Sequence, residues 1–193
     1  MSSEVCGLVL AGGLGRRMGG VDKGLQLLQG RPLTLHVIER LRPQVDRVLI
    51  NANQNLERYA EFGCAVVPDR VGGFAGPLAG LDAGLHATGE PLIVTVPCDS
   101  PFLPFDLVAR LAAARSAVDA DVAVARTGAQ SHPVFALVCS RVRAHLSDFL
   151  ARGERKIDRW YASLRVVEVA FDDEADAFAN INTQAELAQH DRP

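Results

Sequence analysis

The sequence has no excess of basic charge, no long apolar run and no closely spaced pair of cysteines. Its 20 Lys and Arg residues are outnumbered by 23 Asp and Glu residues, which leaves a formal net charge of -3. This balance argues against a protein that wraps a nucleic-acid backbone, because such proteins need a dense basic face. The four cysteines stand far apart and none form a C-x-x-C pair, which excludes the usual zinc-ribbon and redox motifs.

The hydrophobic stretches are all short. No apolar run approaches the roughly 20 residues needed to cross a bilayer, and the N-terminus lacks the basic segment and long apolar stretch of a signal peptide. We therefore expect a cytoplasmic protein with no membrane or nucleic-acid partner, and we interpret its cysteines as buried free thiols. The 193 residues, 48% of them hydrophobic, fit a globular protein with one domain over residues 1–193.

Short apolar runs alternate along the chain with longer segments of helical period, which is the pattern of βαβ units. We expect strands at residues 5–10, 47–51, 65–67, 92–96, 122–125, 134–138 and 164–169. We expect helices at residues 32–41, 55–62, 78–88, 105–115, 142–150 and 156–161, and a final one that opens at Thr183. His132-Pro133 is expected to mark a turn between two strands. The predicted fold is α/β, with a single doubly wound, mostly parallel sheet and helices on both faces.

Polar and glycine residues follow several of the expected strands. In an open parallel sheet, ligands bind at the carboxyl ends of the strands. The residues at those positions are a glycine turn, an amide and two carboxylates: Ala11-Gly12-Gly13, Asn51, Asp69 and Asp99. Together they predict a nucleotide site at one edge of the sheet.

The loop at residues 10–23 carries the strongest local signal. It holds five glycines and three basic residues, Arg16, Arg17 and Lys23. Glycines let backbone N–H groups approach phosphate oxygens closely, and the basic side chains supply the charge that a triphosphate requires. The loop therefore predicts phosphate binding.

Two familiar phosphate-binding motifs are absent from this loop. A Walker A motif would place Lys and Ser or Thr after its last glycine, but Gly20 is followed by Val21-Asp22. A dinucleotide fingerprint would need glycine where Met18 stands. A P-loop NTPase and an NAD dehydrogenase are therefore both disfavoured.

Asp99 ends the most hydrophobic of the expected strands. An isolated carboxylate there would lose hydration, so it needs a cation or hydrogen-bond donors beside it. A magnesium ion that bridges nucleotide phosphates would meet that need. The alternative is a helix N-cap, because Asp99-Ser100-Pro101 precedes an expected helix.

Other polar residues leave two interpretations open. Asp69 either contacts the nucleotide or caps a turn, and Asn51 begins a stretch that also reads as a polar turn. Asn180 and Asn182 precede the last expected helix, where a pure capping role would explain them.

At this point the motifs resemble those of a known family. The loop Leu-Ala-Gly-Gly-x-Gly-x-Arg-Met-Gly-Gly-x-Asp-Lys at residues 10–23 resembles the N-terminal signature of the molybdenum cofactor guanylyltransferases, the MobA family. Val-Pro-Cys-Asp-Ser-Pro-Phe-Leu-Pro at residues 96–104 is similar to that family's metal-binding strand end. Further blocks at residues 76–81, 132–135 and 180–183 match in the expected order. The family belongs to the nucleotidyltransferases with a Rossmann-like fold.

The resemblance implies a role for each matching residue. The GTP-binding residues would be Leu10, Ala11, Gly12, Gly13, Gly15, Lys23, Asn51, Asp69 and Asp99. The residues that act on the phosphates would be Lys23, Asp99 and one of the adjacent Arg16 and Arg17. Asp99 would also hold Mg²⁺, while Asn180 and Asn182 would lie near the metal and the acceptor phosphate.

The reaction that the resemblance implies is guanylyl transfer from GTP to molybdopterin. The terminal phosphate of molybdopterin would attack the α-phosphorus of GTP, and pyrophosphate would leave. Because that phosphate is already ionised near neutral pH, the reaction needs no strong general base. It needs screening between two anions, which Mg²⁺, Lys23 and an arginine would supply.

Three other functions remain open. A cytidylyltransferase acting on molybdopterin would tend to show Ala-Ala-Gly where this chain has Ala11-Gly12-Gly13. A sugar-phosphate nucleotidyltransferase would usually be longer, and a non-catalytic carrier of GTP and molybdopterin would not need both Lys23 and Asp99. We expect a monomer whose protein partners are molybdenum-insertion proteins and client molybdoenzymes.

Overall fold

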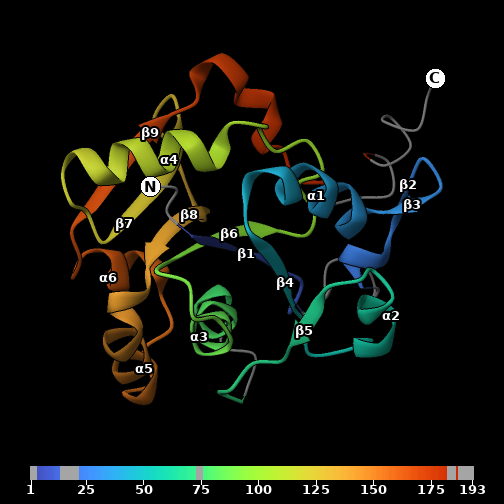
Figure 1. The fold of residues 1–193 in the computed structure, drawn as a ribbon, viewed down its shortest axis with the longest axis horizontal. Coiled ribbons are helices and arrows are strands. Elements are labelled where there is room, and N and C mark those ends of the chain that lie inside the picture. Colours follow the sequence, from blue (N-terminus) through green and yellow to red (C-terminus); the bar gives the residue numbers. More distant parts are fainter. Residues whose placement is uncertain (1–3, 14–21, 73–75, 182–185, 187–193) are drawn as a thin grey trace.

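The structure is a computed structural model that describes residues 4–13, 22–72, 76–181 and 186. Its centre is a seven-stranded sheet with the strand order β5-β4-β1-β6-β8-β7-β9 (Figure 1). The strands are β1 (Val5–Leu10), β4 (Arg47–Asn51), β5 (Ala65–Val67), β6 (Leu92–Pro97), β7 (Val122–Thr127), β8 (Gln130–Cys139) and β9 (Val166–Ala170). Only β8 runs against the others within this sheet. The predicted mostly parallel sheet is confirmed.

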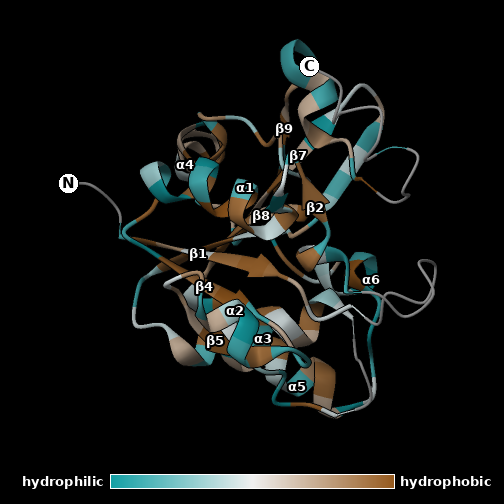
Figure 2. Ribbon diagram, turned by 90° about the vertical axis from the view of Figure 1, so that its right-hand side faces the viewer, coloured by the Kyte–Doolittle hydropathy of each residue, from teal (hydrophilic) through white to brown (hydrophobic). Residues whose placement is uncertain are grey.

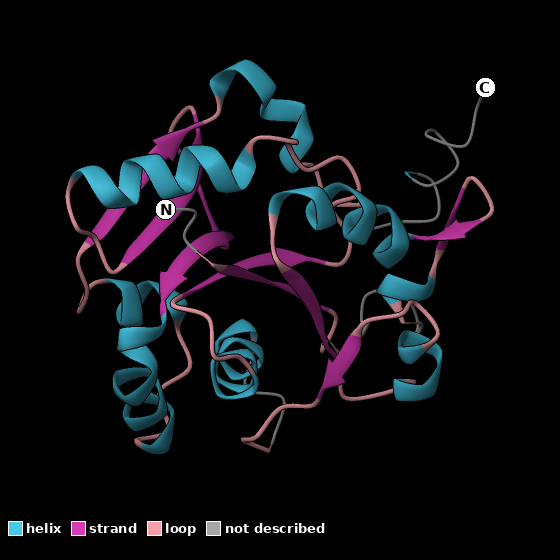
Figure 3. Cartoon of the chain, viewed as in Figure 1, coloured by secondary structure: helices cyan, strands magenta, loops and turns pink. Residues whose placement is uncertain are grey.

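Helices cover both faces of the sheet, as predicted. One face is covered by α1 (Leu33–Leu41) and α4 (Leu107–Ala117), and the other by α3 (Pro77–Ala87), α5 (Arg143–Ala151) and α6 (Ile157–Tyr161) (Figures 1 and 3). The shorter elements are α2 (Leu56–Ala60), η2 (Lys23–Leu25), η3 (Arg42–Gln44), η4 (Ser140–Val142), η5 (Asp172–Phe178) and the small hairpin of β2 (Leu27–Leu28) and β3 (Arg31–Pro32).

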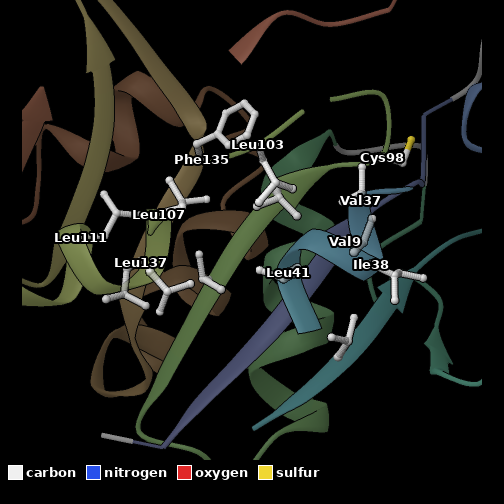
Figure 4. Close-up of a cluster of buried hydrophobic side chains, with 14 of the residues drawn as sticks. Val9, Val37, Ile38, Leu41, Cys98, Leu103, Leu107, Leu111, Phe135 and Leu137 are labelled. Carbon is white, nitrogen blue, oxygen red and sulfur yellow. The ribbon is translucent and has the colours of Figure 1, made fainter. Parts of the chain in front are cut away.

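The core consists of two apolar layers separated by the sheet. Successive residues of a strand point to opposite faces, so Leu8 packs against α3 while Val9 packs against α1. Figure 2 shows β1 and β4 as apolar strands, and Figure 4 shows the layer that contains Val9, Val37 and Leu107. Burial on both faces explains why these strands are continuous hydrophobic runs in the sequence.

The predicted turn at His132-Pro133 is wrong. Both residues lie inside β8, and the turn comes earlier, between Thr127 and Gln130, where Gly128 has a φ of 53°. Val124 of β7 pairs with Ala136 of β8, but the next residue, Ala125, pairs with His132. Residues 133–135 of β8 therefore bulge out of the ladder. A bulge tolerates proline because proline has no backbone N–H group and a bulged residue makes no ladder hydrogen bond.

The remaining expectations have mixed outcomes. All four cysteines are free; Cys6, Cys98 and Cys139 are buried, and Cys64 is half-buried. The expected final helix at Thr183 begins outside the described residues. Within the described ranges, no helix has the length and apolar character needed to cross a membrane.

Candidate active site

The carboxyl ends of β4, β1 and β6 meet at one edge of the sheet. Leu10 is paired with Asn51 on one side and with Pro97 on the other. Beyond the strands, the Ala11 N–H donates to the Asn51 carbonyl at 2.8 Å, and the Cys98 N–H donates to the Leu10 carbonyl at 3.1 Å. These bonds bring the start of the glycine loop close to the segment that carries Asp99, as the sequence predicts.

Asp69 is held by two amides at this edge. Asn51 Nδ2 donates to Asp69 Oδ1 at 2.8 Å, and Asn53 Nδ2 donates to Asp69 Oδ2 at 2.9 Å. Asn53 Oδ1 in turn accepts from the Asp69 N–H at 2.9 Å. Sequence reasoning missed Asn53, because its neighbourhood reads as a polar turn. The three side chains form a network that fixes the orientation of the Asp69 carboxylate.

Two glycines allow the backbone to approach this network. A Cβ at Gly12 would lie 3.0 Å from both Asn51 Oδ1 and Asn53 Nδ2. A Cβ at Gly80, in the first turns of α3, would lie only 2.3 Å from Asn51 Oδ1 and 2.7 Å from Leu10 Cδ2. Gly80 is therefore required by packing, a reason that its position in the sequence does not reveal.

Lys23 and Asp99 form an ion pair between η2 and the end of β6. The distance from Lys23 Nζ to Asp99 Oδ2 is 3.1 Å, and only 24% and 12% of the two side chains are exposed. The helix-cap interpretation of Asp99 is wrong, because α4 begins at Leu107 and has Asp106 at its N-cap. Asp99 is thus a buried carboxylate whose partner is a cation.

Asp22 fixes the start of η2 and with it the position of Lys23. Its Oδ1 accepts from the Gly24 N–H at 3.2 Å and from the Tyr59 hydroxyl, while its Oδ2 accepts from Asn55 Nδ2 at 3.0 Å. Tyr59 is buried, and that burial raises the pKa of its hydroxyl well above the ordinary value. The Asp22 carboxylate therefore holds the backbone in place. The sequence gives no sign of this link to Tyr59.

Asn180 lies next to Asp99. The Ile181 N–H donates to the Asp99 carbonyl at 2.8 Å, and the Ser100 hydroxyl donates to Asn180 Oδ1 at 2.5 Å. Of the predicted site residues, the structure therefore brings Asn180 to the same edge as Lys23 and Asp99. Gly15, Arg16, Arg17 and Asn182 lie outside the described residues.

A cavity of about 600 Å³ adjoins this edge on the side of β8. Its walls are residues 130–135 of β8, Thr127 and residues of η5, and it is completed by Pro97, Ala179 and Asn180. We call it the β8–η5 pocket. It shares Asn180 and Pro97 with the strand-end edge, so the pocket and that edge lie next to each other.

The carboxylates of the site suit a metal that is bound together with phosphates. In the described part of the chain, no cluster of three or more His, Cys, Asp or Glu residues could hold a metal by itself. Asp99 is a single, largely buried carboxylate beside a cation. Magnesium is usually bound by one or two carboxylates plus phosphate oxygens and waters, so a single carboxylate fits such an ion.

Comparison with known proteins gives a consistent result. Residues 7–168 match a family described as the MobA-like NTP transferase domain. The molybdenum cofactor guanylyltransferases of Ralstonia nicotianae and Cupriavidus necator are 51% and 53% identical to this chain, and each match covers 97% of this chain and 96% of the relative. The crystal structure of molybdopterin-guanine dinucleotide biosynthesis protein A from Archaeoglobus fulgidus is similar, with a TM-score of 0.79, 25% identity and 96% coverage of both chains.

A more distant structure shares the fold. The 4-diphosphocytidyl-2C-methyl-D-erythritolsynthase of Anaerococcus prevotii has a TM-score of 0.76 at 11% identity, covering 98% of this chain and 95% of that one. The architecture of the sheet and its helices is therefore retained where most side chains differ.

Proposed function

Because this chain belongs to the MobA-like NTP transferase family, we propose that it transfers GMP from GTP to the terminal phosphate of molybdopterin and releases pyrophosphate. The observation that carries this proposal is the Lys23–Asp99 pair, at 3.1 Å, where the ends of β1 and β6 meet. A cation at this point would stabilise the charge that develops on the transferred phosphate.

GTP would lie across the ends of β1 and β4. Its contacts would be Leu10, Ala11, Gly12, Gly13, Asn51 and Asp69, with Asn53 as an additional residue that orients Asp69. Support comes from the close approach of Gly12 to Asn51 and Asn53, because a Cβ at Gly12 would lie only 3.0 Å from both amide side chains. We keep the prediction that Gly15 and the basic residues Arg16 and Arg17 contact the phosphates.

Asp99 would hold Mg²⁺, which supplies charge neutralisation on the phosphates when it is bound. The fit rests on the position of the carboxylate, which follows β6 and faces Lys23 rather than a helix N-terminus. When GTP and Mg²⁺ are bound, Asp99 would have the metal as its partner and Lys23 would turn toward the phosphates. Each side chain would then keep a partner of opposite charge.

The transfer needs orientation and charge stabilisation more than proton transfer. An oxygen of the acceptor phosphate bonds to the α-phosphorus of GTP, the bond to the bridging oxygen breaks, and pyrophosphate leaves with the electron pair. The acceptor oxygen is already ionised, so no side chain has to remove a proton. Asn180, held by Ser100, and Asn182 would lie near the acceptor phosphate.

The test is pyrophosphate release from GTP, CTP, ATP and UTP with Mg²⁺, with and without molybdenum-loaded molybdopterin. We expect release from GTP alone, and only with the acceptor. Asp99→Asn should abolish release and change GTP affinity far less, whereas Asp148→Asn, an exposed carboxylate on α5, should leave both unchanged. Release from CTP would refute the choice of base, and GTP binding without release would favour a carrier.

A further inference from the structure

We propose that the β8–η5 pocket binds the neutral fused-ring heterocycle of the acceptor and that Asp176 recognises its amino-oxo-pyrimidine edge. The acceptor phosphate would then point out of the pocket, past Asn180, toward Lys23 and Asp99. This inference rests on the proposed function, because it assigns the part of the acceptor that does not react.

The pocket exists because β8 bulges away from β7. Residues 133–135 have no partner on β7, and the bulge is held by Thr95, whose hydroxyl donates to the Val134 carbonyl at 2.7 Å. The pairing between β6 and β8 stops at Thr95, so Pro97 at the end of β6 becomes part of the pocket wall. One side of the pocket is thus built into the sheet, and the opposite side comes from η5 and the residues that follow it.

One wall of the pocket is aromatic. His132 stacks on Phe178 with ring centroids 4.8 Å apart and an interplanar angle of 22°, and Phe135 meets the same Phe178 ring at 4.8 Å. His132 Nε2 also forms a hydrogen bond of 2.7 Å with the Thr127 hydroxyl, which fixes the plane of the imidazole. Phe135 and Phe178 are buried, whereas His132 is partly exposed, so the imidazole is the ring that offers a stacking surface to a planar ligand.

The charge of the pocket selects the end of the acceptor that enters it. Among the described residues that line the pocket, Asp176 is the only carboxylate, and there is no Lys or Arg. A phosphate placed inside would therefore meet a negative charge and no cation. Asp176 is exposed and forms no ion pair with the described residues, so its two oxygens can accept from a ligand.

An amino-oxo-pyrimidine edge fits that carboxylate. It presents two adjacent N–H donors, which match the two oxygens of one carboxylate in a paired, charge-assisted arrangement. A volume of about 600 Å³ is also in the range of pockets that hold small-molecule ligands. Guanine has the same edge, but the Asp69 network that we assign to GTP lies on the β4–β5 side, with β1 between it and β6. The order of the strands therefore favours the acceptor ring for the β8–η5 pocket.

The test uses 6-hydroxymethylpterin, an uncharged fluorescent pterin, titrated into the full chain. We expect saturable binding that Asp176→Asn weakens by about 10-fold or more, the effect of losing a charge-assisted pair. Glu174→Gln removes one charge from the same segment outside the pocket lining and should not change pterin affinity. In the transfer reaction, Asp176→Asn should raise the KM for molybdopterin and leave kcat and GTP affinity unchanged.

The outcomes separate this inference from the proposed function. Unchanged pterin affinity in Asp176→Asn, with normal transfer by the wild-type chain, would overturn the pocket assignment alone. A loss of GTP affinity instead of pterin affinity would also overturn it, because the pocket would then hold guanine. If the wild-type chain bound pterin more tightly than Asp176→Asn and yet showed no transfer activity, that result would refute the proposed function and support the assignment of the β8–η5 pocket.

Discussion

Lys23 Nζ and Asp99 Oδ2 lie 3.1 Å apart although the two residues are 76 positions apart in the chain. We predict that Lys23→Met lowers pyrophosphate release by about 100-fold or more, the usual effect of removing one donor that stabilises transition-state charge. The only other lysine in the sequence, Lys156, gives a matched control. Lys156→Met should keep normal turnover, and an equal loss in both variants would refute a specific role for Lys23.

Tyr59 tests whether Asp22 positions Lys23. Tyr59→Phe removes the buried hydroxyl that donates to Asp22, which should cost about 1 kcal/mol of unfolding free energy. If the contact positions Lys23, kcat should fall several-fold as well. Tyr161→Phe removes a comparable buried hydrogen bond, to the Pro133 carbonyl. Urea unfolding should show a similar loss in both variants, while GTP affinity stays normal in Tyr161→Phe. A normal kcat in Tyr59→Phe would mean that the Tyr59–Asp22 hydrogen bond stabilises the fold but does not position Lys23.

Gly80 tests the packing of α3 against Asn51. Gly80→Ala places a Cβ 2.3 Å from Asn51 Oδ1, so the amide must shift and release Asp69. We expect the KM for GTP to rise by about 10-fold or more, because small displacements of a binding group are costly. Gly89→Ala is the matched control, since a Cβ there meets nothing within 4 Å. Steady-state kinetics that do not distinguish the two variants would remove Asn51 from the GTP site.

His132 predicts a pH-dependent component of stability. Burial lowers the pKa of its imidazole, so the folded chain resists a proton that the unfolded chain accepts. This component is therefore fully present above the ordinary imidazole pKa of about 6.5 and is lost as the pH falls below it. Urea unfolding of the wild-type chain and His132→Phe between about pH 8 and pH 5 should show the smaller acid loss in the variant. Parallel curves would contradict the burial effect.

Much of the fold could be predicted because buried strands and amphipathic helices have different sequence periods. The runs at β1, β4 and β6 end at the residues that form the strand-end edge, so Asn51 and Asp99 could be predicted as neighbours. The extent of β8 and the position of the turn before it were harder to predict. Proline and histidine at residues 132–133 fit a turn and a bulge equally well, and only the pairing of β8 with both neighbours separates the two.

The residues that support the site could not be predicted in the same way. Tyr59 donates to Asp22, 37 positions away in the chain, and Asn53 donates to Asp69, 16 positions away. Gly80 is needed because of the side chain of Asn51, which belongs to another element. Such roles depend on tertiary contacts, which local spacing does not encode.

Because β8 runs in the reverse direction, two different kinds of strand end meet at the same edge of the sheet. β1, β4, β5 and β6 bring their carboxyl ends to the edge, whereas β8 brings its beginning, together with the tip of the β7–β8 hairpin. Changes in the length or sequence of that hairpin would alter the pocket that we propose for the acceptor without touching the strands that we propose for GTP. We therefore expect an exchange of residues 127–135 between relatives to change the acceptor that is used and to leave GTP affinity unchanged.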